Sequence, residues 1–102
     1  MTRAAFVLNI KPDKVAEYVE AHANVWPEMR AAISASGIRN YSIFLDGSRV
    51  FGYYETDDIE ASRVYLAASE VNDRWQNAME EYLEGRVEDG GPATLKEVFR
   101  LD

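Results

Sequence analysis

The sequence predicts an α+β fold in which helices cover one face of an antiparallel sheet. First, short apolar runs rich in β-branched and aromatic residues alternate with longer stretches of helical periodicity, in the order β-α-β-β-α-β. Second, the chain has 102 residues, of which 47% are apolar, which is enough for one core and too short for two. We therefore expect a single domain over residues 1–102.

The first strand and the first helix follow each other closely. Residues 4–10 form a short apolar run, which predicts a strand. Pro12 fits the first turn of a helix, where its missing N–H would have no partner in any case. The residues that then fall on one helical face, at spacing i, i+3, i+4 and i+7, are Val15, Tyr18, Val19 and His22.

A break divides this helical region near residues 23–26. Asn24 can cap a new helix, and Pro27 is tolerated only at an early helical position. Gly37 is a typical residue just beyond a helix C-terminus, so we expect the second helix to end there.

The middle of the chain predicts a β-hairpin. Residues 38–45 and 50–56 have the composition of strands. The turn Asp46-Gly47-Ser48 joins them, with a glycine at a position that can take a positive φ.

The second half predicts two more helices and a last strand. Asp57-Asp58 caps a helix over residues 59–68, and a further helix opens at Ser69 or Glu70 and continues to about residue 83. A loop over residues 85–92 and a strand over residues 94–101 follow.

This order is the ferredoxin-like βαββαβ sandwich, a four-stranded antiparallel sheet with helices on one face. Strand segments such as residues 6–8 and 43–45 are apolar on both faces, while helices can cover only one. A second copy of the sheet is the simplest cover for the other face. We therefore expect a homodimer of the dimeric α/β-barrel type.

Composition excludes several classes of function. Eleven basic against eighteen acidic residues give a net charge of −7, which disfavours binding to nucleic acid or to an anionic membrane. No stretch approaches the roughly 18 to 20 apolar residues of a membrane span. The lack of cysteine removes thiol chemistry and is consistent with a cytoplasmic location. We expect no metal and no cofactor, because metal-ligand spacing, a P-loop and a dinucleotide-binding motif are all missing.

His22 is the only histidine and the first candidate for proton transfer. Tyr18 lies one turn before it on the same helical face, and Trp26 lies four residues beyond it. Each of these side chains has an apolar body and a polar edge, as a sugar-binding cleft requires. The alternative is an aromatic packing cluster around a buried histidine.

Tyr41, Trp75 and Gln76 complete the candidate site. Tyr41 alternates with Ile43 on its strand, so it faces either the core or a cleft. Trp75 lies on the apolar stripe of its helix, where the pattern by itself favours a core position. Gln76 beside it is polar and can reach solvent or a ligand.

Several motifs resemble the L-rhamnose mutarotase family nearly end to end. The strongest are Glu17-Tyr18, the run His22-Ala23-Asn24-Val25-Trp26-Pro27-Glu28-Met29, and Asn40-Tyr41-Ser42-Ile43. The first two make an E-Y-x3-H-x3-W-P-E pattern. Arg74-Trp75 and Glu97-Val98-Phe99 extend the similarity toward the C-terminus.

The resemblance implies a dimeric isomerase that interconverts the α and β anomers of L-rhamnose without a cofactor. It implies that His22 is the acid/base group and that Tyr18 and Tyr41 contact the sugar. Trp75 matches the first member of a Trp-Trp pair that also contacts the sugar, whereas Gln76 stands in the second place. An amide there hydrogen-bonds to hydroxyls where an indole would stack.

A second departure lies at residues 89–92, Asp-Gly-Gly-Pro, where the family has an N-P-D-N-S-P loop. Together the two departures leave L-rhamnose, L-fucose or another 6-deoxyhexose open as the substrate. Mutarotation takes a proton from the anomeric hydroxyl and gives one to the ring oxygen, so a group titrating near neutrality suffices. We expect His22 to be the proton donor. The group that takes the other proton is the same histidine, a tyrosine hydroxyl or a water.

Two rival hypotheses remain at this stage. The same fold serves cofactor-free monooxygenases that act on flat aromatic substrates, and an aromatic cleft with one histidine would suit them. A non-catalytic dimer that binds a small ligand is the other, with His22 acting only as a hydrogen-bonding group. The Trp26-Pro27-Glu28 context favours the mutarotase hypothesis.

Overall fold

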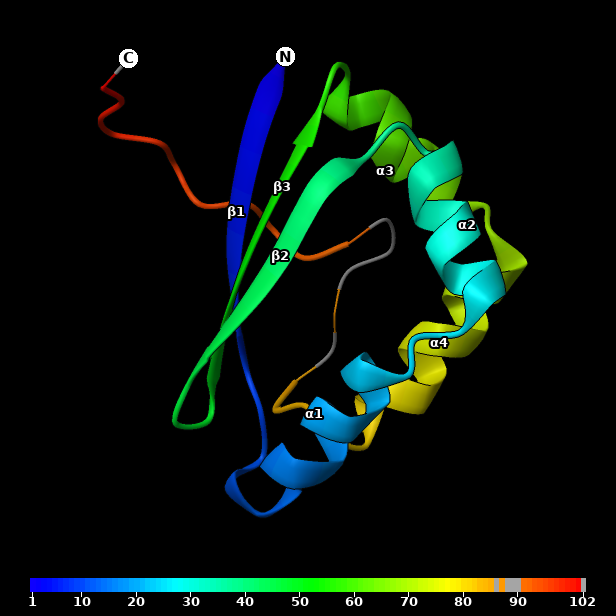
Figure 1. The fold of residues 1–102 in the computed structure, drawn as a ribbon, viewed down its shortest axis with the longest axis vertical. Coiled ribbons are helices and arrows are strands. Elements are labelled where there is room, and N and C mark those ends of the chain that lie inside the picture. Colours follow the sequence, from blue (N-terminus) through cyan, green and yellow to red (C-terminus); the bar gives the residue numbers. More distant parts are fainter. Residues whose placement is uncertain (86, 88–90, 102) are drawn as a thin grey trace.

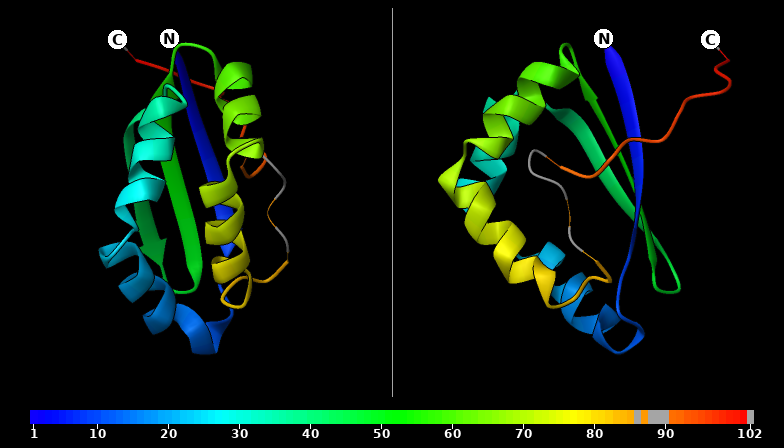
Figure 2. Two further views of the ribbon diagram at one scale, coloured as in Figure 1. Left: turned by 90° about the vertical axis from the view of Figure 1, so that its right-hand side faces the viewer. Right: turned by 180° about the vertical axis from the view of Figure 1, so that it is seen from behind.

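A three-stranded antiparallel sheet lies on one side of the molecule and all helices cover one of its faces (Figures 1 and 2). The computed structural model describes residues 1–85, 87 and 91–101. The strand order is β1-β3-β2, so the central strand of the sheet is the last of the three in the sequence. This arrangement confirms the α+β class with helices on a single face.

The elements follow the predicted order as far as the last helix. Their bounds are β1 Thr2–Asn9, the 3-10 helix η1 Pro12–Lys14, α1 Val15–Ala23, α2 Pro27–Ala35, β2 Arg39–Asp46, β3 Arg49–Thr56, α3 Ile59–Ala67 and α4 Glu70–Glu80. The expected break between the first two helices is confirmed, with Pro27 at the start of α2. Side chains cap the later helices as predicted. Asp58 Oδ1 accepts from the Ala61 N–H at 3.1 Å, and Ser69 Oγ accepts from the Asn72 N–H at 3.3 Å.

The predicted hairpin is confirmed, and it contains an irregularity that the sequence pattern did not indicate. Gly47 turns the chain with φ +62°, and β2 pairs antiparallel with β3. The register shifts between Arg39 and Ser42, which marks a β-bulge. Asn40 within it has φ +52°, a left-handed conformation that asparagine tolerates better than most residues.

The prediction of a fourth strand over residues 94–101 is wrong, because this segment has no strand structure. It passes the outer edge of β1 and runs on away from the helices (Figures 1 and 2). The Leu95 N–H donates to the Ala5 carbonyl at 2.7 Å, and Glu97 pairs with Arg3. Val98, Phe99 and Leu101 are largely exposed. A segment of strand-like composition forms a strand only where a neighbouring strand pairs with it along its length. This segment contacts β1 over only a short stretch.

The loop predicted over residues 85–92 lies partly outside the described residues, which leave out 86 and 88–90. Within the part of the chain that the structure describes, no helix is long and apolar enough to cross a membrane.

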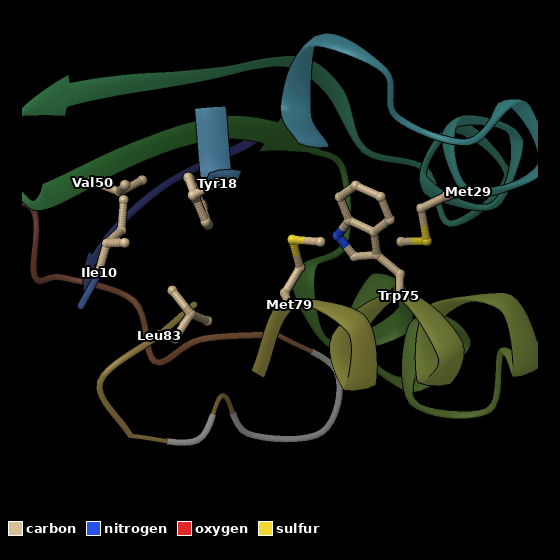
Figure 3. Close-up of a cluster of buried hydrophobic side chains, with 7 residues drawn as sticks. All are labelled: Ile10, Tyr18, Met29, Val50, Trp75, Met79 and Leu83. Carbon is tan, nitrogen blue, oxygen red and sulfur yellow. The ribbon is translucent and has the colours of Figure 1, made fainter. Parts of the chain in front are cut away.

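The space between helices and sheet holds two hydrophobic clusters. The larger lies toward α1 and α4 and consists of Ile10, Tyr18, Met29, Val50, Trp75, Met79 and Leu83 (Figure 3). The smaller, toward α3, consists of Ala4, Ile38, Tyr54 and Leu66. The Phe6 ring, 2% exposed, lies directly over Gly52 on the neighbouring strand. Only a glycine fits there, because a Cβ would overlap the ring.

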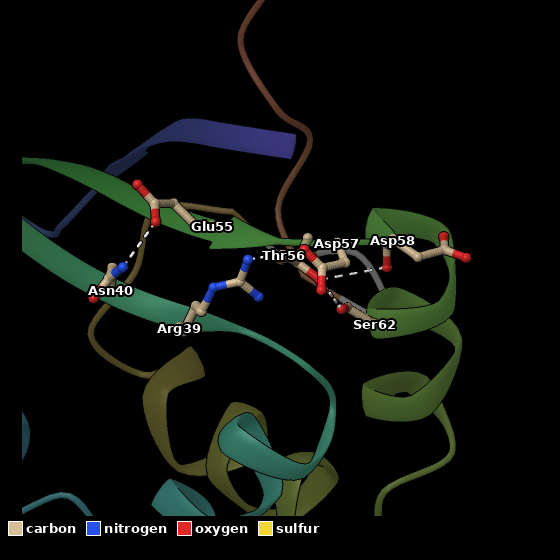
Figure 4. A network of polar contacts seen from close by, with 7 residues as sticks. All are labelled: Arg39, Asn40, Glu55, Thr56, Asp57, Asp58 and Ser62. Atoms are coloured by element: carbon tan, nitrogen blue, oxygen red, sulfur yellow. Dashed lines mark hydrogen bonds and ion pairs between the residues drawn. The ribbon is translucent and has the colours of Figure 1, made fainter. Parts of the chain in front are cut away.

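A buried polar cluster of Ser36, Thr56 and Ser62 ties α3 to the ends of α2 and β3. The Ser62 hydroxyl donates to the Ser36 carbonyl at 2.7 Å. The Ser62 and Thr56 hydroxyl oxygens are 2.7 Å apart. Figure 4 marks this contact with a dashed line. Because the one Ser62 proton is already engaged, Thr56 is the donor in the second bond. The cluster is therefore satisfied internally.

Candidate active site

Two adjoining cavities lie between the sheet and the helices and share four lining residues. The larger, of about 530 Å³, is within the usual size of small-molecule sites, and the smaller has about 60 Å³. The shared residues are His22, Tyr41, Ile43 and Trp75. Tyr18 and Gln76 line the smaller cavity. Five of the six residues predicted for the site therefore line one or both of these two adjoining cavities.

A hydrogen bond within α1 determines the tautomer of His22. Its Nδ1 lies 2.9 Å from the carbonyl oxygen of Tyr18, one helical turn earlier. A carbonyl can only accept, so Nδ1 carries the proton and donates. When the imidazole is neutral, Nε2 on the opposite edge of the ring is left as the acceptor. The ring also packs against Tyr18 at 4.2 Å and edge-on against Trp75 at 5.5 Å between centroids.

Burial lowers the pKa of His22 below its ordinary value of 6.5, and the hydrogen bond to the Tyr18 carbonyl opposes this in part. Desolvation disfavours the charged imidazolium, whereas the carbonyl favours it. His22 is therefore neutral at physiological pH. In this state it can accept a proton at Nε2 and return it.

The two cavity tyrosines stay protonated. Burial raises the pKa of Tyr18, which is 5% exposed, to about 12. Burial also raises the pKa of Tyr41, followed by the charges that Tyr18 and Tyr54 would carry if ionised. Tyr41 presents 38% of its surface to solvent, while its ring stacks on Tyr54 at 5.4 Å and meets Phe6 edge-on at 6.2 Å. Both phenols are thus hydrogen-bonding groups and not bases near neutral pH.

Trp75 forms a wall of the cavity, and Trp26 stands behind it. Trp75 is only 7% exposed, and the Trp26 ring meets it edge-on at 5.1 Å. The Arg74 guanidinium lies over the Trp26 ring, 5.7 Å from its centroid. Trp26 lines neither cavity, so the structure places it in support of Trp75 and not at the surface that a ligand would touch.

The β-bulge in β2 aims Tyr41 at the cavity. The Asn40 side chain donates to Glu55 Oε1 at 2.8 Å, and the Tyr53 hydroxyl donates to Glu55 Oε2 at 2.7 Å (Figure 4 shows the first). These bonds lower the pKa of the Glu55 carboxyl. The sequence analysis did not single out Asn40 as a lining residue. Its tolerance of positive φ was the one local signal available.

Other lining residues were also missed because nothing in their local pattern distinguishes cleft from core. The additional residues of the larger cavity are Val25, Met29, Arg30, Ile33, Ser34, Ile38 and Arg39. Among the residues that the structure describes, no three histidine, aspartate or glutamate side chains are grouped so as to hold a metal ion.

Comparison with known proteins decides the family. The family model of L-rhamnose mutarotase matches residues 3–101. The chain belongs to the L-rhamnose mutarotase family. It is 41% identical to an L-rhamnose mutarotase of Bacillus subtilis and 37% identical to one of Oceanobacillus iheyensis, with both members of each pair covered in full.

Solved structures agree with this assignment. A crystal structure of an L-rhamnose mutarotase from Formosa agariphila superposes with a TM-score of 0.79 at 26% identity, over the whole of both chains. Tetracenomycin F2 cyclase of Streptomyces glaucescens, a polyketide cyclase, superposes with a TM-score of 0.67 at 20% identity, over 100% of this chain and 98% of the other. The second similarity shows a common fold only.

The resemblance to the mutarotase family is thus confirmed. The chain is a sugar mutarotase, an isomerase that acts on carbohydrates. The family match does not favour the alternatives of a cofactor-free monooxygenase or a non-catalytic ligand-binding dimer.

Proposed function

We propose that the chain interconverts the α and β anomers of L-rhamnose or a related 6-deoxyhexose, with His22 as the acid/base group. The observation that carries this proposal is the bond from Nδ1 to the Tyr18 carbonyl, which leaves Nε2 as the acceptor on a cavity-lining ring. L-Rhamnose is the sugar in the names of the related enzymes.

The reaction begins with neutral His22. Nε2 accepts the proton of the anomeric hydroxyl, the C1–O1 bond becomes a carbonyl, and the bond between C1 and the ring oxygen breaks. The imidazolium then gives the same proton to the ring oxygen, and the open-chain aldehyde is formed. Rotation about the bond between C1 and C2, followed by the reverse steps, closes the ring with the other configuration.

One histidine can serve both oxygens because both are bonded to the same carbon. This favours His22 over a tyrosine as the group that takes the first proton, since the raised pKa values of Tyr18 and Tyr41 make their phenolates scarce. A transient imidazolium is stabilised by the Tyr18 carbonyl, which already accepts from Nδ1. No step moves electrons between molecules, so no cofactor enters.

The remaining predicted residues bind the sugar. Tyr18 and Tyr41 provide phenolic hydroxyls, and Trp75 offers an apolar wall to the ring carbons. Gln76 provides a polar amide on the same helix as Trp75. Trp26 acts indirectly, because it holds the Trp75 ring in place.

Saturation-transfer proton NMR on equilibrated L-rhamnose, and then on L-fucose, tests the proposal. Saturating one anomeric proton and observing the other reports exchange at equilibrium. Wild-type protein should transfer saturation, and His22→Ala should return it to the spontaneous rate. Glu20→Ala, an exposed residue on the same helix, is the matched control and should behave as wild type. Exchange that persists in His22→Ala would remove the histidine from the mechanism.

We also propose a homodimer, formed through the face of the sheet that carries no helices. Phe6 faces the helices, so its neighbour Val7 faces away from them. Val7 pairs with Phe51, and Phe51 pairs with Phe44, which places three apolar side chains in a row across the sheet. Phe44 is 65% exposed. Phe44→Lys should convert a dimer into a monomer in analytical ultracentrifugation, whereas a monomeric wild type would contradict the proposal.

A single domain over residues 1–102 and a cytoplasmic location complete the proposed function. The family match over residues 3–101 supports the first, and the absence of cysteine supports the second.

A further inference from the structure

Gln76 lies on α4, directly after Trp75, and lines the smaller cavity together with Tyr41 of the sheet. Its side chain is held by Asn72, one helical turn earlier. The Gln76 Nε2 group donates to Asn72 Oδ1 at 3.2 Å. Among the described residues, this is the hydrogen bond that orients the Gln76 amide.

The orientation of Asn72 is itself determined by the backbone. Asn72 is 6% exposed, and its Nδ2 group donates to the Leu66 carbonyl at 3.0 Å. Because a carbonyl cannot donate, the amide nitrogen of Asn72 must face Leu66, and its oxygen must face Gln76. An Asn72 oxygen can only accept, so Gln76 must present its nitrogen in turn. The amide oxygen of Gln76 is thereby directed away from Asn72.

We infer that Gln76 is a specificity-determining residue that accepts a hydrogen bond from one hydroxyl of the sugar, and that Asn72 is its positioning residue. The inference rests on the proposed function for the identity of the ligand as a sugar. The Leu66 carbonyl, Asn72 and Gln76 form a chain of hydrogen bonds, called the relay below. Because each amide donates to the group before it, the relay leaves the Gln76 oxygen as an acceptor at the cavity.

The relay gives the cavity a second fixed acceptor. His22 Nε2 is the first, and both are fixed by a backbone carbonyl, of Tyr18 in one case and of Leu66 in the other. Two acceptors at separate points of one cavity suit a neutral polyol that offers two hydroxyl donors. A sugar that lacks the hydroxyl read by Gln76 would bind as well to a variant without the amide as to wild type.

Monodeoxy sugars test this, because removing the right hydroxyl should abolish the effect of removing Gln76. The dissociation constants of L-rhamnose and of its 2-deoxy, 3-deoxy and 4-deoxy analogues are measured by NMR titration, for wild type and Gln76→Met. Methionine has similar length and no amide. Gln76→Met should weaken L-rhamnose by about threefold to tenfold, the effect of one net hydrogen bond. The same substitution should leave one analogue unchanged.

Two further variants separate this reading from a packing effect. Asn77→Leu, on the exposed side of the same helix, should leave every affinity as in wild type. Asn72→Ala frees the Gln76 amide to rotate and should reduce the ratio of affinities between L-rhamnose and that one analogue. A purely structural role would weaken all four sugars equally. If Asn72→Ala does not fold, Gln76→Met still decides the result.

The same samples distinguish the inference from the proposed function. Binding with the expected pattern but without anomeric exchange would contradict the mutarotase chemistry and support the role of Gln76. Exchange with equal weakening of all four sugars in Gln76→Met, or with no weakening, would overturn the inference and leave the mutarotase proposal intact. Failure of wild type to bind any of the four sugars would overturn both.

Discussion

The two ends of the helix–sheet sandwich treat their polar groups in opposite ways. At the α3 end, Thr56 and Ser62 satisfy each other and the Ser36 carbonyl, beside the hydrophobic cluster that contains Tyr54 and Leu66. At the α1 and α4 end, His22 and Gln76 each use one polar atom in a hydrogen bond to the protein, and both residues line a cavity. Polar side chains whose hydrogen bonds are all made within the protein stabilise the fold. Side chains that use only one of their two polar atoms in this way keep the other atom available for a ligand.

The largest effect expected from this comparison is the loss of anomeric exchange when His22 can no longer transfer a proton. His22→Gln should lower anomeric exchange by about 10²-fold to 10⁴-fold, the usual contribution of general acid–base catalysis, because an amide does not titrate. Stability should change little, since glutamine can still donate to the Tyr18 carbonyl. Saturation-transfer NMR and thermal unfolding on the same sample check both. A large fall in melting temperature would show that His22 is needed for the fold.

The contact between Gly52 and the Phe6 ring should give the next largest effect. Gly52→Ala places a Cβ against the Phe6 ring and should lower the free energy of unfolding by about 1–3 kcal/mol, as overpacking usually does. The Phe6 ring also touches Tyr41, so exchange should fall as well. Urea unfolding of Gly52→Ala and of the double variant with Phe6→Leu checks the cause. The smaller side chain should restore part of the loss.

Ser62→Ala should lower stability and leave anomeric exchange unchanged, which is the reverse of the result expected for His22→Gln. It leaves the buried Ser36 carbonyl without its donor, and one unsatisfied group costs about 1–3 kcal/mol of unfolding free energy. Exchange measured well below the melting temperature should be unchanged, since none of the three cluster residues lines either cavity. Ser34→Ala, at an exposed position of α2, is the control for the unfolding measurement only, because Ser34 lines the larger cavity. Loss of exchange in Ser62→Ala would contradict the separation of the two ends.

The smallest effect is a pH dependence of stability. The pKa of His22 is lowered in the folded state, so between that value and 6.5 the unfolded chain binds more protons than the folded one. The free energy of unfolding should therefore fall as pH falls from about 6.5 toward the folded pKa. Exchange should fall only as the pH drops through the lowered pKa of folded His22, because the imidazolium cannot accept the first proton. His22→Gln should remove this contribution to the slope; an unchanged slope would assign it to other groups.

Much of the fold and of the candidate site could be predicted from local sequence pattern. Helical spacing placed Tyr18 and His22 on one face, and that spacing is also what lets the Tyr18 carbonyl reach the His22 ring. The Asp58 and Ser69 caps and the glycine turn at residue 47 are local devices, so they were readable from neighbouring residues. Trp75 was ambiguous between core and cleft. A buried indole that also forms a cavity wall is both.

The predictions that were wrong or incomplete concern residues whose position depends on partners distant in the sequence. The composition of residues 94–101 predicted a strand, but a strand exists only where another offers a continuous ladder, and β1 offers Leu95 one bond. Trp26 has the residue type of a sugar-stacking group, yet its place behind Trp75 follows from the packing of α2 on α4. The sequence alone determined the element order as far as α4 and indicated the one histidine as the candidate for proton transfer. Tertiary structure decided which atoms of His22 and Gln76 are left for a ligand, because that depends on the carbonyls packed beside them.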